Sequence, residues 1–235
     1  MAVPHHAFLR RSVAGLALTL LLAVPALPAF ADTAKIGWAV AANDVPADPA
    51  VRFGQLPNGM RYAILKNATP AAQAAMRLRI GSGSLQESEE QQGLAHFLEH
   101  MAFKGSTHVP AGEMIHILER KGLAFGPDTN ASTDYGQTIY QLDLPQVDDD
   151  TLDTGLMLLR ETGSELTLDA KSFETERGVI LSEERLRDTP DYRATRSFID
   201  LMVDGQRITR RLPIGKVDVI RNAPCLLYTS DAADE

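Results

Sequence analysis

The sequence predicts an α+β fold with one mainly antiparallel sheet covered by helices. Segments whose apolar residues alternate, as in strands, are mixed along the chain with segments of helical spacing. A turn signal near the start of the body indicates a β-hairpin, which joins antiparallel strands. The composition, 44% hydrophobic and 23% charged, is that of an ordinary globular protein.

Alternation predicts the strands. Residues 56–59 (Leu-Pro-Asn-Gly) form a turn signal, and the β-forming residues 60–66 follow it, so this stretch is expected to be a hairpin. Residues 76–80 alternate apolar with arginine and end at the glycine bend of residues 81–83. In residues 138–144, one face carries Thr138, Tyr140, Leu142 and Leu144.

Helical spacing predicts the remaining elements. Residues 91–103 carry an apolar stripe of Leu94, Phe97, Leu98 and Met101. Asp169 is placed to cap the start of a long helix. We expect helices at residues 91–103, 110–120, 150–161, 169–188 and 190–204.

The first 31 residues have the pattern of a signal peptide. Residues 1–31 combine two arginines, an apolar run at residues 13–24 and small residues before Asp32. We expect cleavage before Asp32 and export to the periplasm. The apolar run is short for a bilayer and two prolines follow it, so no stable membrane anchor is expected after cleavage.

The flanks of the predicted body differ from it in composition. Residues 32–50 are rich in Ala, Asp and Pro and are expected to be a linker. Residues 225–235 fit no preceding pattern and resemble the translation of a transposon-type sequencing adapter, so we expect a non-native tail. They hold the single cysteine. Without disulfides, stability must come from core packing and from any bound metal.

The charge pattern argues against nucleic acid as a partner. The formal net charge is −8, and no cluster of Lys and Arg follows the first dozen residues. Binding to phosphates needs a basic face. A phosphate-binding loop is not indicated either, since no Gly-Lys-Ser/Thr follows the glycines at residues 81–83.

One motif carries chemistry, His96-Phe-Leu-Glu99-His100. Residues four apart lie on one face of a helix, so both imidazoles can bind a single zinc ion. Glu99, beside them, can take a proton from a water that the metal activates. The alternative is a helix whose histidines face solvent or are satisfied in the core. Burying two His and a Glu without a ligand is costly, which weighs against that alternative.

Six segments together resemble the pitrilysin and insulinase family of zinc metallopeptidases, whose motif is His-x-x-Glu-His. The chain resembles most the bacterial exported branch, related to mitochondrial processing peptidase. The resemblance spans about residues 51–224. The segments, in family order, are residues 56–59, 82–87, 93–105, 130–133, 138–140 and 176–185.

The resemblance implies the roles of the motif residues. His96 and His100 would bind zinc, and Glu99 would be the general base. The third ligand in the family is a Glu on a later helix, with another acidic residue seven positions before it that supports catalysis. Here that pair is Glu183 and Glu176. Seven residues make nearly two helical turns, so both carboxylates would share one face.

The spacing leaves the third ligand open. The separation from His100 to Glu183 is a few residues longer than is usual in the family, which implies an insertion around residues 124–128. If the shorter separation that is usual in the family applies here, Glu176 is the third ligand instead of Glu183. Glu184 is the less favoured candidate.

The same resemblance implies a substrate edge and a missing part. Asn130 and Ala131 resemble the strand edge to which a peptide substrate adds, the alternative being a plain turn asparagine. His108 and His116 are expected to be surface histidines. The family encloses substrate between two similar halves, so a C-terminal half or a partner subunit would be missing. The body at residues 51–224 would be an incomplete N-terminal metallopeptidase domain.

The function expected from these features is a zinc-dependent endopeptidase that hydrolyses peptides or small unfolded proteins through a zinc-bound water activated by Glu99. The fragment alone is expected to be inactive. The alternative is a non-catalytic peptide-binding or scaffold subunit of a two-subunit processing peptidase.

Overall fold

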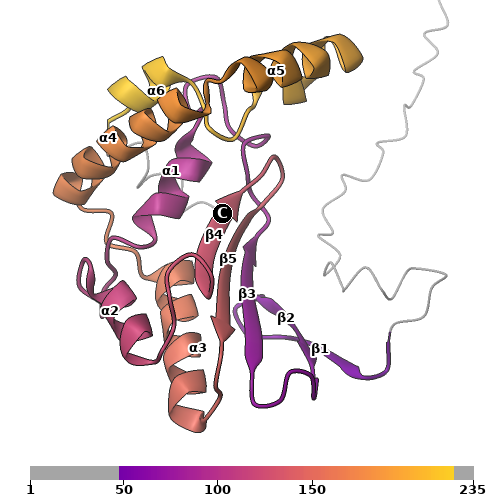
Figure 1. Ribbon diagram of the computed structural model, residues 1–235, viewed down its shortest axis with the longest axis vertical. Helices are drawn as coiled ribbons and strands as arrows, with labels where there is room; N and C mark the ends of the chain where they lie inside the picture. The colour runs from indigo at the N-terminus through magenta and orange to yellow at the C-terminus, as the bar shows by residue number, and fades with distance from the viewer. Residues whose placement is uncertain (1–47, 225–235) are drawn as a thin grey trace, which may run out of the picture. The chain divides into compact units, whose positions relative to one another are not determined.

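The computed structural model describes residues 48–224 (Figure 1). The predicted signal peptide, the first sixteen positions of the predicted linker (residues 32–47) and the predicted tail lie outside the described residues. The chain divides into two units, Met1–Lys66 and Asn67–Glu235.

The described part of the first unit is a β-hairpin. Strand β1 (Val51–Gln55) pairs antiparallel with β2 (Arg61–Leu65), and Gln55 lies opposite Arg61. The amide of Gly59 donates to the carbonyl of Leu56 at 3.0 Å and closes the turn. The predicted hairpin is therefore confirmed, with its turn where the sequence signal lies.

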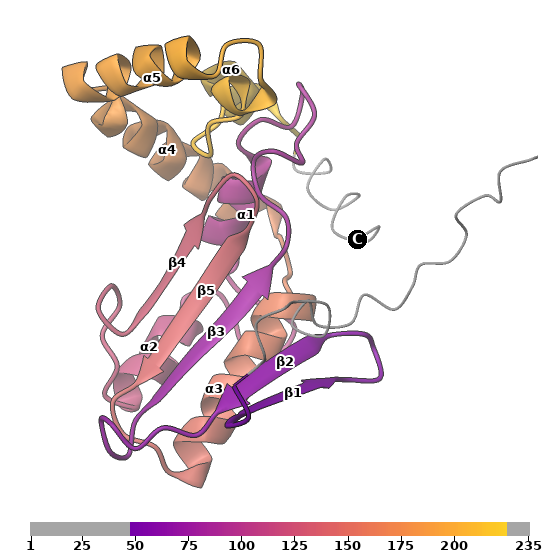
Figure 2. The ribbon, with the colours of Figure 1, turned by 90° about the vertical axis from the view of Figure 1, so that its right-hand side faces the viewer.

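The second unit is built on a three-stranded antiparallel sheet. Its strands are β3 (Ala74–Ile80), β4 (Thr129–Thr133) and β5 (Thr138–Leu144), in the order β3-β5-β4 (Figure 2). Buried and half-buried residues alternate along β5, as the sequence predicts. Strand β4 lies at an edge of the sheet.

Helices cover one face of this sheet (Figure 1). Helices α1 (Leu94–Met101), α2 (Glu113–Arg120) and α3 (Asp149–Ser164) lie on that side. The apolar residues of α2 and α3 pack on β5 because the strand turns its buried residues toward them. The buried members of this core are Val109, Met114, Leu118, Leu123, Leu142, Leu144 and Leu158.

A second core joins α1 to the C-terminal helices. Phe97 of α1 stacks on Phe173 of α4 (Ala170–Arg187) with ring centroids 4.3 Å apart. The other buried members are Leu94, Met101, Ile180, Ile220 and Ala223. Asp169 caps α4 as expected, since its side chain accepts from the amides of Lys171 and Ser172.

The remaining elements follow α4. Helix α5 (Pro190–Met202) has no buried residue, and the short η2 (Arg207–Arg210) and α6 (Val217–Asn222) close the described chain. All five predicted helices are found, with ends shifted by a few residues. Helices η2 and α6 are not predicted from the sequence, because helices of four and six residues give too short a periodic pattern.

No helix within residues 48–224 is both long and apolar enough to cross a membrane.

The loop between β3 and α1 passes very close to the turn that joins β4 and β5. A Cβ atom at Gly83 would lie 2.2 Å from the carbonyl oxygen of Asp134 and 2.6 Å from the amide nitrogen of Gln137. Next to it, the amide of Ser84 donates to the Asp134 carbonyl at 3.2 Å. This contact fixes where the chain enters α1, and it requires glycine.

Replacing Gly83 with alanine is expected to lower the free energy of unfolding by about 1–3 kcal/mol, because backbone atoms would have to move to admit the methyl group. Urea denaturation measures the change. The matched control is Gly178→Ala on α4, where a Cβ meets nothing within 4 Å. It should be neutral or slightly stabilising. Equal stability of the two variants would contradict the proposed contact.

Candidate metal centre

Helix α1 presents the three residues of the sequence motif. Its apolar side faces the second core through Phe97 and Met101, so the residue before each of these, His96 and His100, lies beside that core. The two imidazole rings are one turn apart, with centroids 4.8 Å from each other. The side chain of His96 is 7% exposed and that of His100 is 21% exposed.

Glu183 reaches the two histidines from α4. Its Oε2 lies 3.6 Å from Nε2 of His96 and 3.4 Å from Nε2 of His100. Among residues 48–224, these three side chains form the one group of His, Cys, Asp or Glu whose ligand atoms lie within 4.8 Å of one another. Donors around a tetrahedral zinc lie about 3.3 Å apart. The donor set and its spacing therefore fit zinc, with a fourth position left for water or substrate.

In the metal-free cluster, the pKa values of His96 and His100 are shifted in opposite directions. Burial lowers the pKa of His96 to about 4, so its imidazole is neutral and keeps a free lone pair at pH 7. Burial also opposes protonation of His100, but hydrogen bonds to Glu183 and Glu176 outweigh it and raise the pKa of His100. The hydrogen bond with His100 is the main cause that lowers the pKa of Glu183 to about 2.

Glu176 lies behind the cluster, on the other side of the His100 ring. Its Oε2 is 3.1 Å from Nδ1 of His100, and its Oε1 is 2.6 Å from Nζ of Lys104. The side chain of Glu176 is 4% exposed. Because it faces Nδ1 and not the shared Nε2 position, the arrangement favours Glu183 over Glu176 as the third ligand. Glu184 is not part of the cluster.

Glu99 projects from α1 toward the end of strand β4. It is 8% exposed, and its Oε2 accepts a hydrogen bond from Oγ1 of Thr133 at 2.6 Å. Burial raises the pKa of Glu99, and the hydrogen bond from Thr133 opposes that rise. A carboxylate whose pKa is moved upward from its ordinary value is better matched to proton transfer near neutral pH.

Thr133 and Lys104 are two residues near the candidate site whose contacts the sequence does not predict. Both lie inside segments that carry the family resemblance, residues 130–133 and 93–105. Their contacts join residues 34 and 72 positions apart, since Thr133 meets Glu99 and Lys104 meets Glu176. Such pairs have no local periodicity that could have revealed them.

Asn130 and Ala131 lie in the edge strand β4 and not in a turn. The side chain of Asn130 is exposed, and its Oδ1 accepts from the amide of Ala131 at 2.9 Å. The two other described histidines of the body are outside the cluster. His108 pairs with Glu161, and the exposed His116 pairs with Glu119 on its own helix.

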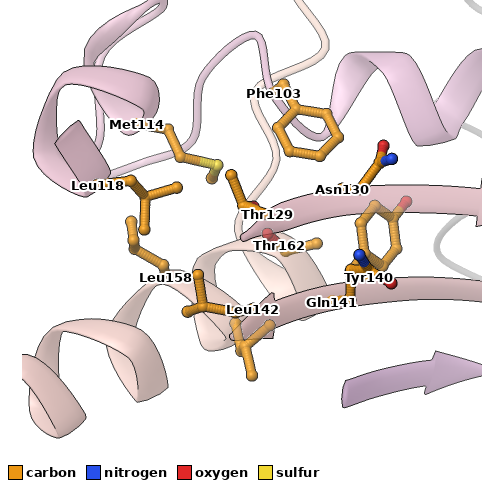
Figure 3. A pocket seen from close by; sticks show the side chains of 11 residues that line it. Phe103, Met114, Leu118, Thr129, Asn130, Tyr140, Gln141, Leu142, Leu158 and Thr162 are labelled. Atoms are coloured by element: carbon orange, nitrogen blue, oxygen red, sulfur yellow. The ribbon is translucent and has the colours of Figure 1, made fainter. Parts of the chain in front are cut away.

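Two hollows flank these elements. The first lies between β4, β5, α2 and α3 and is drawn in Figure 3; its volume of about 20 Å³ holds a water molecule but no side chain. The second is open, with a volume of about 550 Å³, and runs along α4 beside Glu183. Of the three candidate metal ligands, only Glu183 lines this second hollow. The apolar side chains around the first hollow include Phe103, Met114, Leu118, Leu142 and Leu158.

Comparisons with known proteins show the family of this chain. The family model described as insulinase (peptidase family M16) matches residues 62–196. The chain is 37% identical over 179 residues to the probable zinc protease PqqL of Haemophilus influenzae, covering 76% of this chain and 19% of that protein. The corresponding protein of Escherichia coli is 36% identical over 176 residues, covering 75% of this chain and 19% of that protein.

Solved structures show the same fold. The crystal structure of the periplasmic protease PqqL from Escherichia coli matches with a TM-score of 0.77 and 33% identity, over 80% of this chain and 21% of that one. Pitrilysin matches with a TM-score of 0.64 and 25% identity, over 78% of this chain and 19% of that one. The chain thus spans about a fifth of the length of these relatives.

Zinc binding to the metal-free protein at pH 6 is expected to release about one proton, because zinc ligands must be deprotonated. His100, with its raised pKa, carries that proton, whereas His96, with a pKa of about 4, carries none. Isothermal titration calorimetry in buffers of different ionisation enthalpy measures the number released. The variant His116→Gln should release the same number. Release of two protons would contradict the neutral state of His96.

Proposed function

Since this chain belongs to the insulinase family, peptidase family M16, we propose that it is the N-terminal catalytic part of an exported zinc-dependent endopeptidase. Its substrates would be peptides or small unfolded proteins. The observation that carries the proposal is the convergence of His96, His100 and Glu183, with Glu99 on the same helical turn. The names of the relatives, zinc proteases, support the same class of reaction.

Zinc bound by His96, His100 and Glu183 would supply a Lewis acid that lowers the pKa of a water molecule toward 7 and polarises the scissile carbonyl. Glu99 then accepts the proton of the attacking water and delivers it to the leaving nitrogen. Thr133 holds Glu99 in place for both transfers through its 2.6 Å hydrogen bond. Glu176 accepts from Nδ1 of His100, which leaves Nε2 of that ring free to bind the metal.

Strand β4 offers the substrate a place beside the base. Within residues 48–224, β4 pairs along its length with β5 alone, and an isolated bridge to Phe125 engages only its first residue, Thr129. The rest of its other edge has main-chain groups that an extended peptide can bond. Because β4 ends at Thr133, which touches Glu99, a peptide added along Asn130 and Ala131 would run toward the reacting groups. The added strand would replace the contact between Asn130 Oδ1 and the Ala131 amide.

We further propose that a C-terminal half or a partner subunit completes the enzyme. The relatives are about five times as long as the matched segment, and the face of α4 beside Glu183 is open. A second half over that face would exclude water and enclose the substrate. Export to the periplasm is proposed from the signal-peptide pattern of residues 1–31 and agrees with the periplasmic relative.

The substitution Glu99→Gln in the full-length protein is expected to lower kcat about 10²- to 10⁴-fold while zinc content stays unchanged, because it removes the base and not a ligand. Cleavage of a quenched fluorescent peptide and metal analysis measure the two quantities. A chelator should abolish cleavage by the wild-type protein. The exposed Glu119→Gln on α2 serves as the matched control and should keep full activity.

Two outcomes would oppose the proposal. Full activity of Glu99→Gln would remove the proposed base. A wild-type protein that binds zinc and peptide but does not cleave would favour the non-catalytic subunit.

The substitution Thr133→Val is expected to shift the acidic limb of the kcat/KM pH profile to higher pH. The hydroxyl stabilises the ionised form of Glu99, so its loss raises the pKa of Glu99 further, and the base is then active only at higher pH. The pH dependence of peptide cleavage measures the shift. Thr133→Ser keeps a hydroxyl and should retain the wild-type profile; a shift in the opposite direction would contradict the proposed contact.

A further inference from the structure

Lys104 reaches the candidate metal centre from just beyond the end of α1. The helix ends at Met101, and the amide of Lys104 donates to the Met101 carbonyl at 2.9 Å, which continues the turn. Lys104 therefore lies four positions after His100, beyond the last helical residue. Its ammonium group crosses to α4 and meets Oε1 of Glu176 at 2.6 Å.

Glu176 is shared between two side chains. One carboxylate oxygen faces Lys104 and the other faces Nδ1 of His100 at 3.1 Å. The carboxylate is almost fully buried, so water cannot replace either contact at low cost. With both oxygens held, the plane of the carboxylate is fixed. With only one held, it can turn about its last side-chain bond.

The orientation of this carboxylate decides which nitrogen of His100 is available. When Oε2 accepts the Nδ1 proton, the lone pair lies on Nε2, the nitrogen that faces Glu183 at 3.4 Å. Carboxylates that hold a metal-binding histidine in this way set both the tautomer and the direction of the ring.

We propose that Lys104 is a positioning residue of the metal centre: its contact with Oε1 of Glu176 holds Oε2 of the same carboxylate against His100 and so directs Nε2 of His100 at the metal. The inference rests on the proposed function only in that zinc binds between His96, His100 and Glu183. It adds Lys104 to the contacts that support His100, in which Glu176 lies between the two side chains.

An ordinary surface ion pair is the competing explanation for the contact. Lys104 is 38% exposed, and exposed ion pairs contribute little. Here, however, the acceptor is 4% exposed and its second oxygen touches the candidate ligand. A surface pair predicts no effect on metal affinity, whereas the positioning role predicts an effect that passes through Glu176.

The test measures zinc affinity of the full-length protein by competition with a chromogenic chelator. Lys104→Met is expected to weaken zinc binding about tenfold, the lower end of the range for residues that support a metal ligand. Lys104→Arg keeps the charge and should restore most of the affinity. The matched control is Lys121→Met, which removes an ion pair with Asp150 on α3 and should leave zinc affinity unchanged.

A double-mutant comparison separates positioning from general stability. If Lys104 acts through Glu176, then Lys104→Met causes no further loss of affinity in a Glu176→Gln background. An equal loss in both backgrounds, or no loss in either, overturns the role of Lys104. Should Lys104→Met not fold, as judged by circular dichroism, Lys104→Gln supports the same comparison.

The outcomes for Lys104 and for the proposed function are distinguishable. Tight zinc binding by the wild type and by Lys104→Met alike overturns only the role of Lys104. Failure of the wild type to bind zinc would instead overturn the metal centre, and this inference with it.

Discussion

The packing of α1 against α4 is the contact on which the candidate site depends. Phe97 stacks on Phe173, and the fully buried Ile180 lies nearly two turns further along α4. Glu176 and Glu183 lie four residues before and three residues after Ile180, so they share the stripe that faces α1. A slip of one helical turn, about 5.4 Å, would take Glu183 out of reach of both histidines. The apolar core therefore sets the distances on which metal binding depends.

Burial of charged groups around this core carries an energetic cost that function explains. Glu99 and Glu176 are nearly inaccessible to water, and each has a hydrogen-bond or ion-pair partner. Within residues 48–224, Nδ1 of His96 is the one buried side-chain nitrogen or oxygen without a hydrogen-bond partner. Such groups are seldom retained for stability, because an apolar replacement packs without the desolvation penalty. Glu99, Glu176 and His96 lie on α1 and α4 around the candidate metal centre, where binding and chemistry are proposed.

The sequence allowed prediction of those parts of the fold that repeat locally. The hairpin, the alternation of β5 and the five longer helices follow from periodicity and turn residues. The pairing of His96 with His100 follows from the helical repeat. The choice between Glu183 and Glu176 did not, because it depends on how α4 is registered against α1, and that register is set by Phe173 and Ile180 across the core. Contacts between distant segments, such as that of Thr133 with Glu99, give no periodic signal.

Strand β4 lacks a clear sequence pattern for a strand, and its proposed function as a peptide-binding edge gives a physical reason. Its five residues are mostly polar, so they do not form the apolar alternation that reveals a strand. Under the proposed function this edge accepts a peptide and has to remain soluble while it is unpaired, and the exposed side chains of Asn130 and Ser132 would meet that need. The inner face of β4 also carries a polar side chain, because Thr133 there donates a hydrogen bond to Glu99. A more apolar strand would be easier to predict, but it would pair with other chains as readily as with a substrate, and a valine in place of Thr133 would leave the buried carboxylate without its hydroxyl partner.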